Sequence, residues 1–352
     1  MNSPYISVIV TAHDRRDYLL EAVESIRKDE RVAPFTEVIV VKNFQDPVMD
    51  DTLENHGVRL LYTKAVASGA KLALAIRASK GEILSFLEDD DRFQPGKLRE
   101  VLDAFKADAN LGFHQHRIVH VDQEGLPLAL SASRARSLEW LDRIQEVHVG
   151  VADRKHFFGG RYPLDPHMNL SAISVRSKIL TDRLPSLERI QLIPDAFLFF
   201  AAMMSPCSIA LSSKPLTEYR IHAQNASGGN LHNRDSQQSR LSAFSVAALQ
   251  SFETIHSMAV DWGDPFVLHL VDSVIRIQYL LSLMRQRQVR RLDLLRALAR
   301  LRSCRDTYAW RTHRRIAPLG FVYLLSPKLG QHLYLSYKLQ EAGSGPVVAP
   351  NS

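Results

Sequence analysis

Four consecutive carboxylates, Glu88, Asp89, Asp90 and Asp91, give the strongest chemical signal in this 352-residue chain. They follow residues 83–87, an apolar run that predicts a buried strand. Like charges packed this closely repel one another, so the run costs stability unless a cation neutralises it. Carboxylate oxygens suit Mg²⁺ or Mn²⁺, which proteins hold with one or two carboxylates plus substrate phosphates. The run therefore predicts either a divalent metal site at a strand end or a solvated acidic turn that caps the next helix.

Two polar residues further along the chain offer acid–base chemistry. Asp195 opens an apolar stretch over 195–204 that predicts a helix, where an acid either caps the helix or acts as a general base. His222 stands in the sequence YRIHAQNAS at 219–227, and a lone histidine is more often structural than catalytic. The residue types permit catalysis but do not by themselves decide between these roles.

Three histidines alternate along a strand predicted over 111–121, namely His114, His116 and His120, with Asp122 just beyond them. Such alternation is typical of a half-exposed strand, and a metal-binding patch is the less favoured alternative.

The elements that must position these residues alternate between strand and helix in the first third of the chain. Apolar, β-branched runs predict strands at 6–11, 37–41, 59–62 and 83–87, and helical periodicity predicts helices at 16–28, 68–79 and 95–106. This order predicts an α/β fold with a doubly wound, mostly parallel sheet, whose strands are apolar because helices cover both faces. Ligands of such sheets bind at the carboxyl ends of the strands, where the acidic run lies.

The rest of the chain changes character twice. Residues 126–194 read as loops and short strands, whereas residues from 241 onward show helical periodicity with few glycines until Gly320.

Composition is that of a globular protein, with 45% hydrophobic and 23% charged residues. The net charge is +6, but residues 285–315 alone carry eleven arginines and two acids, or +9, which leaves −3 for the remainder. This basic segment interleaves arginines with leucines, which predicts either an amphipathic helix on an anionic membrane or a helix with a solvated basic face.

Targeting signals are weak. The start, MNSPYISVIVTAHDRR, has no basic region before its apolar run, so we expect no signal peptide. The apolar segment 266–284 is interrupted by His269, Asp272 and Arg276, and we predict no transmembrane helix. Two distant cysteines, Cys207 and Cys304, argue against a disulfide framework and fit a reducing compartment.

The chain resembles the family 2 glycosyltransferases of the GT-A fold. The resemblance rests on four stretches within residues 5–227: ISVIVTAHDRRDYLLEAVESI, EVIVV, KGEILSFLEDDDRFQPGKL and YRIHAQNAS. It implies a metal-dependent, inverting enzyme with a Rossmann-like GT-A domain followed by an α-helical C-terminal region.

The resemblance also implies roles for individual residues. Asp91 would bind the metal together with Asp89 and His222, and Asp89 and Asp90 would contact the sugar nucleotide, although Glu88-x-Asp90 fits the family's spacing too. Asp195 would be the general base, with Pro194 in place of the family's usual Glu. His222, assisted by Arg220, would reach the diphosphate or complete the metal site.

For the nucleotide, the resemblance implies that Thr11, Ala12 and His13 contact the base and ribose. Asn43 replaces the family's usual Asp as acceptor for the pyrimidine N3–H, and Lys71 would neutralise the diphosphate. The alternatives to these nucleotide contacts are that His13 caps a helix and that Lys71 is a solvated helix lysine. The segment Met168-Asn169-Leu170-Ser171 and the nearby Arg176 resemble the family's acceptor-side strand.

We therefore predict a GT-A domain over 1–228, with a nucleotide-binding half at 1–125 and an acceptor half at 126–228. A helical region at 229–342 and a disordered tail at 343–352 would follow. The predicted activity is Mn²⁺- or Mg²⁺-dependent transfer from a nucleotide-diphosphate sugar to a carbohydrate or lipid-linked acceptor, in the cytoplasm or on the inner face of the membrane. The alternatives are a nucleotidyltransferase, whose Gly-rich signature is missing near the first strand, and a non-catalytic nucleotide-sugar-binding protein. Nucleic-acid binding is not expected, because only Tyr308 and Trp310 are interleaved with the basic segment.

Overall fold

The computed structural model describes residues 5–27, 31–128, 145–159, 166–222, 225, 234–286, 289–313 and 316–341. The chain divides into two compact units, each described by itself below. The first comprises Met1–Val119, Ile144–Ala152 and Pro166–Tyr219, and the second comprises His120–Arg143, Asp153–Asp165 and Arg220–Ser352. The domain boundary predicted at residue 228 falls outside the described residues and stays a prediction, as does the disordered tail.

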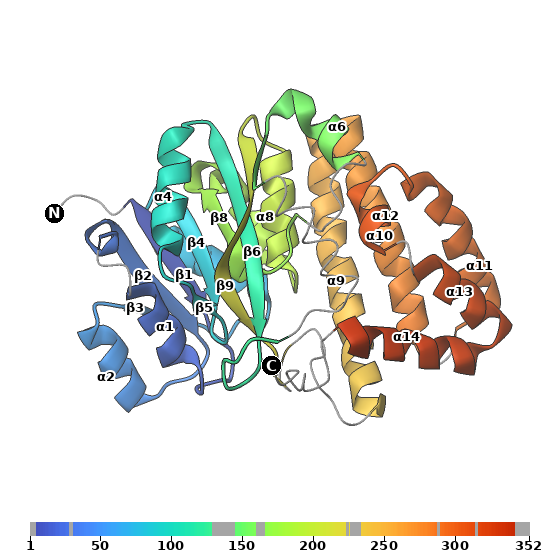
Figure 1. Ribbon diagram of the computed structural model, residues 1–352, viewed down its shortest axis with the longest axis horizontal. Coiled ribbons are helices and arrows are strands. Elements are labelled where there is room, and N and C mark those ends of the chain that lie inside the picture. The colour runs from blue at the N-terminus through green and yellow to red at the C-terminus, as the bar shows by residue number, and fades with distance from the viewer. Residues whose placement is uncertain are drawn as a thin grey trace, which may run out of the picture. The chain divides into compact units, whose positions relative to one another are not determined.

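A single sheet of nine strands organises the first unit, in the order β3-β2-β1-β4-β8-β6-β9-β5, with β7 paired to β9. The strands β1 (Ile6–Thr11), β2 (Thr36–Lys42), β3 (Arg59–Tyr62) and β4 (Ile83–Glu88) are parallel to one another (Figure 1). All four lie where the sequence predicts strands. The apolar runs of β1, β2 and β4 are buried because helices cover both faces of the sheet, whereas the edge strand β3 is only partly buried.

Helices on the two faces bury alternate residues of each strand. Ile6, Val8 and Val10 of β1 share one hydrophobic core with α1 (Leu19–Arg27) and α4 (Lys97–Ala107). On the other face, α3 (Ser68–Ala78) packs against β1, β2 and α7 (Leu184–Glu188). The predicted helices at 16–28, 68–79 and 95–106 correspond to α1, α3 and α4, whose ends differ from the predicted ones by at most three residues.

A helix that the sequence did not predict lies between β2 and β3. This helix, α2 (Pro47–Asn55), begins with Asp46 as its N-cap, whose side chain accepts a hydrogen bond from the Met49 N–H at 3.2 Å. Asp followed by Pro is a helix-start signal, but the polar run after it hides the apolar periodicity.

The strands of the predicted acceptor half are antiparallel and interleave with those of the nucleotide half. β8 (Ile173–Arg176) lies between β4 and β6 (Leu111–Val121), and β9 (Ser208–Arg220) pairs with β5 (Arg92–Phe93) and β7 (Glu146–Val149). β7 and β8 agree with the short strands expected within 126–194, but the described part of this region also contains short helices that the sequence did not predict. The helix predicted at 195–204 is α8 (Pro194–Met203), and its residues from Ala196 onward are buried.

Helices make up the described part of the second unit from residue 234 onward. They are α9 (Arg234–Trp262), α10 (Pro265–Arg285), α11 (Arg291–Arg300), α12 (Tyr308–His313), α13 (Ile316–Leu325) and α14 (Pro327–Glu341), after the short α6 (Arg154–Phe158) (Figure 1). Gly263, at φ +77°, makes the turn between α9 and α10, and Asp264 caps α10 through the N–H groups of Phe266 and Val267.

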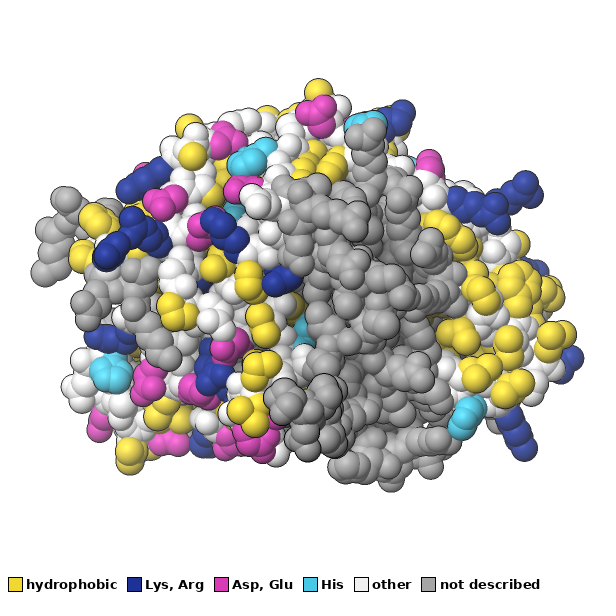
Figure 2. Space-filling model, in the orientation of Figure 1, with side chains coloured by type: hydrophobic (Ala, Val, Ile, Leu, Met, Phe, Trp, Pro, Cys, Tyr) yellow, Lys and Arg dark blue, Asp and Glu magenta, His cyan; other side chains and the backbone are white. Residues whose placement is uncertain are grey.

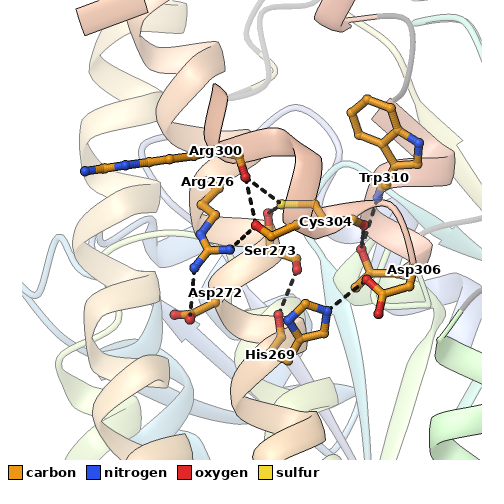
Figure 3. Close-up of polar contacts among 10 residues, drawn as sticks. His269, Asp272, Ser273, Arg276, Arg300, Cys304, Asp306 and Trp310 are labelled. Atoms are coloured by element: carbon orange, nitrogen blue, oxygen red, sulfur yellow. Dashed lines mark hydrogen bonds and ion pairs between the residues drawn. The ribbon is translucent and has the colours of Figure 1, made fainter. Parts of the chain in front are cut away.

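Among the described helices, α10 is the one that is long and apolar enough to cross a membrane. It carries Asp272 and Arg276, and 56% of its most apolar window is buried inside the protein, as in a core helix. Polar contacts fasten α10 to the segment after α11 (Figure 3). Arg276 donates to Ser303 Oγ, His269 pairs with Asp306 at 3.0 Å, and Cys304 Sγ lies 3.8 Å from the Ser273 carbonyl.

Candidate functional site

The acidic run lies at the edge of the sheet where β1 and β4 both end. Glu88 stands opposite Thr11 in the parallel register, and the Asp89 N–H donates to the Thr11 carbonyl at 3.2 Å. Asp89, Asp90 and Asp91 are 2%, 5% and 1% exposed, which excludes the alternative of a solvated acidic turn. Buried carboxylates require compensation, and the structure provides two different kinds.

Arg15, in the loop after β1, compensates the first two aspartates. Its guanidinium pairs with Asp90 at 2.5 Å and also with Asp89. Burial acts to lower the pKa of Arg15, but the charges of Asp90 and Asp89 outweigh it and raise that pKa. The compensation is incomplete, because burial and Asp90 still raise the pKa of Asp89 to about 7 despite the opposing charge of Arg15.

Neutral donors hold Asp91. Ser171 Oγ donates to Asp91 Oδ2 at 2.6 Å, and Asn169 Nδ2 donates to the same oxygen at 3.2 Å. Behind them, the buried Lys97 donates to the Ser171 carbonyl at 2.6 Å and lies 3.3 Å from the ring centroid of Phe93. Burial lowers the pKa of Lys97 well below its usual value, while Asp91 acts in the opposite direction. These two hydrogen bonds fix the orientation of the Asp91 carboxylate.

Asp195 reaches the same cluster from α8. Burial, followed by the charges of Asp90, Asp91 and Asp195, raises the pKa of Glu88 well above its usual value. The Asp195 carboxylate accepts the N–H of Ala196 at 2.9 Å, so it also has the capping role weighed from the sequence. Ile193, two residues before it, adopts φ +58°, a strained conformation for a β-branched residue. Such strain is found at functional sites, where surrounding structure fixes it.

The acids fit a divalent cation that shares its coordination with a substrate. Among the described residues, no three His, Cys, Asp or Glu side chains form a ready metal site. Mg²⁺ and Mn²⁺ are commonly held by one or two carboxylates plus phosphate oxygens, and this cluster offers the buried carboxylates of Asp89, Asp90 and Asp91. Asp91, with Asp89 beside it, would hold the ion.

The residues predicted to contact the nucleotide lie around the same edge. The Ala12 N–H bonds to the Val41 carbonyl at 2.9 Å, and the His13 N–H points to Asp89 Oδ2 at 3.4 Å. His13 is half-exposed, and burial together with Lys71 lowers its pKa. Lys71 is buried rather than solvated, and burial lowers its pKa while Asp89 opposes that shift.

Asn43 is engaged in a way that the sequence did not suggest. Its Oδ1 accepts the Asp14 N–H at 2.9 Å, and its Nδ2 donates to Asp14 Oδ1 at 2.7 Å. Asp14 has φ +55°, so Asn43 fixes a left-handed residue in the loop after β1. If Asn43 binds the base, its Oδ1 must accept hydrogen bonds from both the base and the Asp14 N–H.

His222 belongs to the second unit, so its predicted contacts with the metal or diphosphate stay predictions. It is buried, and its backbone N–H donates to Asn225 Oδ1 at 2.6 Å. Asn225 Nδ2 donates in turn to the Arg220 carbonyl at 3.1 Å, and Arg220 donates to the Gln123 carbonyl at 2.6 Å. Ala223, Gln224, Ala226 and Ser227 of the motif lie outside the described residues.

One expectation needs correction. The histidine face of β6 is buried rather than half-exposed: His114 and His116 are fully buried, and His116 Nε2 lies 2.8 Å from Thr217 Oγ1.

Arg176, which resembles part of the family's acceptor-side strand, lies in β8. It donates hydrogen bonds to the carbonyls of Leu111, Phe105 and Asp108.

Three functional candidates were missed or undervalued: Arg15, Lys97 and Ser171. Arg15 could have been found, because loops after neighbouring parallel strands meet at one edge and an acidic run needs a cation. Ser171 was noted only as part of a strand-like segment, and Lys97 carries no distinguishing signal in the sequence.

Residues 7–153 match the family model "Glycosyl transferase family 2". The chain contains a family 2 glycosyltransferase domain. It is also similar to "Putative teichuronic acid biosynthesis glycosyltransferase TuaG" of Bacillus subtilis (strain 168), at 25% identity over 154 residues. That match covers 42% of this chain and 60% of the relative. These findings confirm the predicted family for residues 7–153, and the matched relative is itself named a glycosyltransferase.

Two solved structures share the fold of this glycosyltransferase. Mannosyltransferase PcManGT of Pyrobaculum calidifontis, in complex with GDP-Man and Mn²⁺, aligns with a TM-score of 0.54 at 13% identity, covering 97% of this chain and 86% of that one. S. aureus TarS 1-349, in complex with UDP-GlcNAc, aligns with a TM-score of 0.51 at 13% identity, covering 96% and 92%. The predicted GT-A fold with a helical C-terminal region is thereby confirmed.

Proposed function

We propose that this glycosyltransferase moves a glycosyl group from a nucleoside-diphosphate sugar to an acceptor hydroxyl, with inversion at the anomeric carbon. The observation that carries the proposal is the convergence of Asp195 with Glu88 and the buried acids Asp89 to Asp91 at the end of β4. The nucleotide-sugar complexes of the two structural neighbours support the class of donor.

Each step of the transfer has a residue suited to it. Asp195, half-buried at the start of α8, accepts the proton of the acceptor hydroxyl as that oxygen attacks. Asp91 is held in one orientation by Ser171 and Asn169, so it is ready to bind a cation without reorganising. Lys71 and Arg15 provide positive charge at the same edge.

A divalent ion held by Asp91 and Asp89 would supply charge stabilisation for the departing nucleoside diphosphate. Thr11, Ala12, His13 and Asn43 form the proposed wall for the base and ribose, Asp90 contacts the donor, and His222 completes the diphosphate or metal site. The acceptor is proposed to be a carbohydrate or a lipid-linked glycan, and the site of action the cytoplasm or the inner face of its membrane.

A donor screen tests the proposal. The thermal midpoint of the chain is measured with UDP-, GDP-, dTDP- and CMP-sugars, each with and without Mn²⁺, because a ligand that binds the folded state raises stability by RT ln(1 + [L]/Kd). We expect one nucleotide class to stabilise the protein only with Mn²⁺, and Asp91→Ala to abolish that shift.

The matched control is Asp103→Ala, which removes an exposed carboxylate from α4. Stabilisation of Asp91→Ala equal to that of the wild type would refute the metal assignment. Donor binding without hydrolysis or transfer to any offered acceptor would instead favour a non-catalytic binding protein.

A further inference from the structure

The helices α11, α13 and α14 leave an apolar surface exposed within the second unit. α13 contains no charged residue, yet only Ile316, Gly320 and Tyr323 of its ten residues are buried. A helix that is hydrophobic on all sides is normally enclosed by protein or lipid. Phe321 and Leu325 are 56% and 84% exposed, so this helix presents an apolar face for which the described chain provides no cover.

Neighbouring helices extend this surface. Gly320 lies against Leu298 of α11, since a Cβ added there would meet Leu298 at 2.8 Å, and a Cβ added at Gly330 of α14 would lie closer still to the backbone of Tyr323. The three helices therefore pack tightly. Their exposed large side chains are Leu292 and Leu295 of α11, Phe321 and Leu325 of α13, and Leu329 and Leu333 of α14. We call these six residues, together with Arg290, Arg291 and Arg296, the basic-apolar face.

Arginines border the apolar part. Figure 2 shows hydrophobic side chains gathered over α11 and α13, with Lys and Arg side chains at the margins. The side chains of Arg290 and Arg296 are 83% and 64% exposed, and Asp293 is the only acid in α11. The surface therefore combines exposed leucine and phenylalanine with a net positive border.

We propose that the basic-apolar face inserts its leucines and Phe321 into the interface of an anionic phospholipid bilayer while its arginines contact the headgroups. Such a bilayer matches both parts of the face, because its acyl chains accommodate the apolar residues and its negatively charged headgroups attract the arginines. Symmetric pairing of two copies through this face would instead bring two basic borders together, and the repulsion disfavours it.

The inference goes beyond the docking expected from residues 285–315, because it adds the uncharged α13 and α14 and therefore insertion. It does not rest on the proposed transfer chemistry, since none of the proposed site residues belongs to the face. At ten residues, α13 is too short to cross a bilayer, so it would lie in the interface.

Binding is measured by co-sedimentation with phosphatidylglycerol or phosphatidylcholine vesicles at low and high salt. We expect the protein to bind phosphatidylglycerol vesicles and not phosphatidylcholine vesicles. The double variant Phe321→Ser/Leu325→Ser should lower the partition coefficient by at least ~10-fold, since each buried apolar side chain contributes to interfacial binding. The control Val246→Ser/Val260→Ser removes two similarly exposed residues from α9 and should bind as the wild type does.

Insertion of the face into the bilayer is measured separately, by fluorescence. Both native cysteines are buried, so Leu325→Cys can be labelled selectively with an environment-sensitive fluorophore. Its emission should rise with phosphatidylglycerol vesicles, whereas the same label at Val260→Cys should not respond. The proposal is overturned if the wild type does not sediment at low salt, if the label stays in water while the protein binds, or if the wild type is a dimer that Phe321→Ser/Leu325→Ser converts to a monomer.

Discussion

The acidic cluster after β4 and the basic-apolar face of α11, α13 and α14 both concentrate like charges, but they differ in how those charges are compensated. Each buried acid has named partners: Arg15 for Asp89 and Asp90, Ser171 and Asn169 for Asp91. The arginines of the basic-apolar face are solvated, and their contacts with Asp293 are long, at 3.9 and 4.0 Å.

The difference predicts how each region responds to mutation. In a buried network of low dielectric, removing one partner leaves another group uncompensated, so single substitutions have large effects. On an exposed surface, screened charges act together, so single substitutions have small effects.

Asp195→Asn should give the largest effect, because it removes the proposed base while keeping the size and capping ability of the side chain. We expect kcat to fall by ~10²–10⁴-fold, the usual contribution of a general base, with donor affinity nearly unchanged. The control is Asp182→Asn, at an exposed position. Turnover like that of the wild type, or a product of retained anomeric configuration, would remove Asp195 from this role.

Arg15→Met should lower the free energy of unfolding in metal-free buffer by about 3–5 kcal/mol, the cost of leaving buried charges without their partner. Adding Mn²⁺ should restore more stability to this variant than to the wild type, because the ion replaces the lost cation. Arg16→Met is the matched control, since that neighbouring side chain is 50% exposed. Equal urea-unfolding midpoints for both variants would show that Arg15 does not compensate the cluster.

Ser171→Ala should weaken Mn²⁺-dependent donor binding by ~10–100-fold, as found when a partner that orients a metal ligand is lost. The control Ser174→Ala removes a buried hydroxyl that donates to Ser85 instead. Titration calorimetry with the donor identified in the screen provides the affinities. If the two variants bind equally well, Asp91 does not depend on Ser171 for its orientation.

His114→Leu should make stability less sensitive to acid. Burial lowers the pKa of folded His114 to about 3, against 6.5 for an unperturbed histidine. Between these values the unfolded chain binds one more proton, so stability is lost as pH falls below about 6.5, by up to ~1.4 kcal/mol per pH unit. Urea unfolding at pH 7, 6 and 5 should show a shallower dependence in the variant. The exposed control His56→Leu should keep the wild-type slope; an unchanged slope in His114→Leu would contradict burial of a neutral imidazole.

Arg296→Gln should have the smallest effect. One basic residue near an anionic surface contributes ~1 kcal/mol, so vesicle binding should weaken only about fivefold while the free energy of unfolding stays the same. Arg99→Gln, at an exposed position in α4 of the first unit, is the control. Complete loss of binding from Arg296→Gln alone would mean that the face contains a localised anion site rather than a distributed one.

The sequence predicted well those elements whose apolar runs are long. β1, β2 and β4 could be located because a parallel sheet covered on both faces requires uninterrupted apolar strands. β8 could not be located from hydrophobic periodicity, because a strand of four residues in an irregular region is too short to show one. Its place in the sheet is set by pairing with strands that are distant in sequence. The acids and Asp195 were named from the sequence, whereas Arg15, Ser171 and Lys97 act through contacts across 74 to 80 positions of the chain.

The place of β8 in the sheet constrains the order in which the chain can fold. β4 and β6 are close in sequence, but β8 lies between them and supplies the hydrogen bonds that each needs on its inner edge. On the ribosome, the first four parallel strands emerge with the β4 edge unpaired until residues 173–176 have been synthesised. An open β edge is a template for association with other chains, so this interval is the stage of biosynthesis at which the nascent protein depends most on protection.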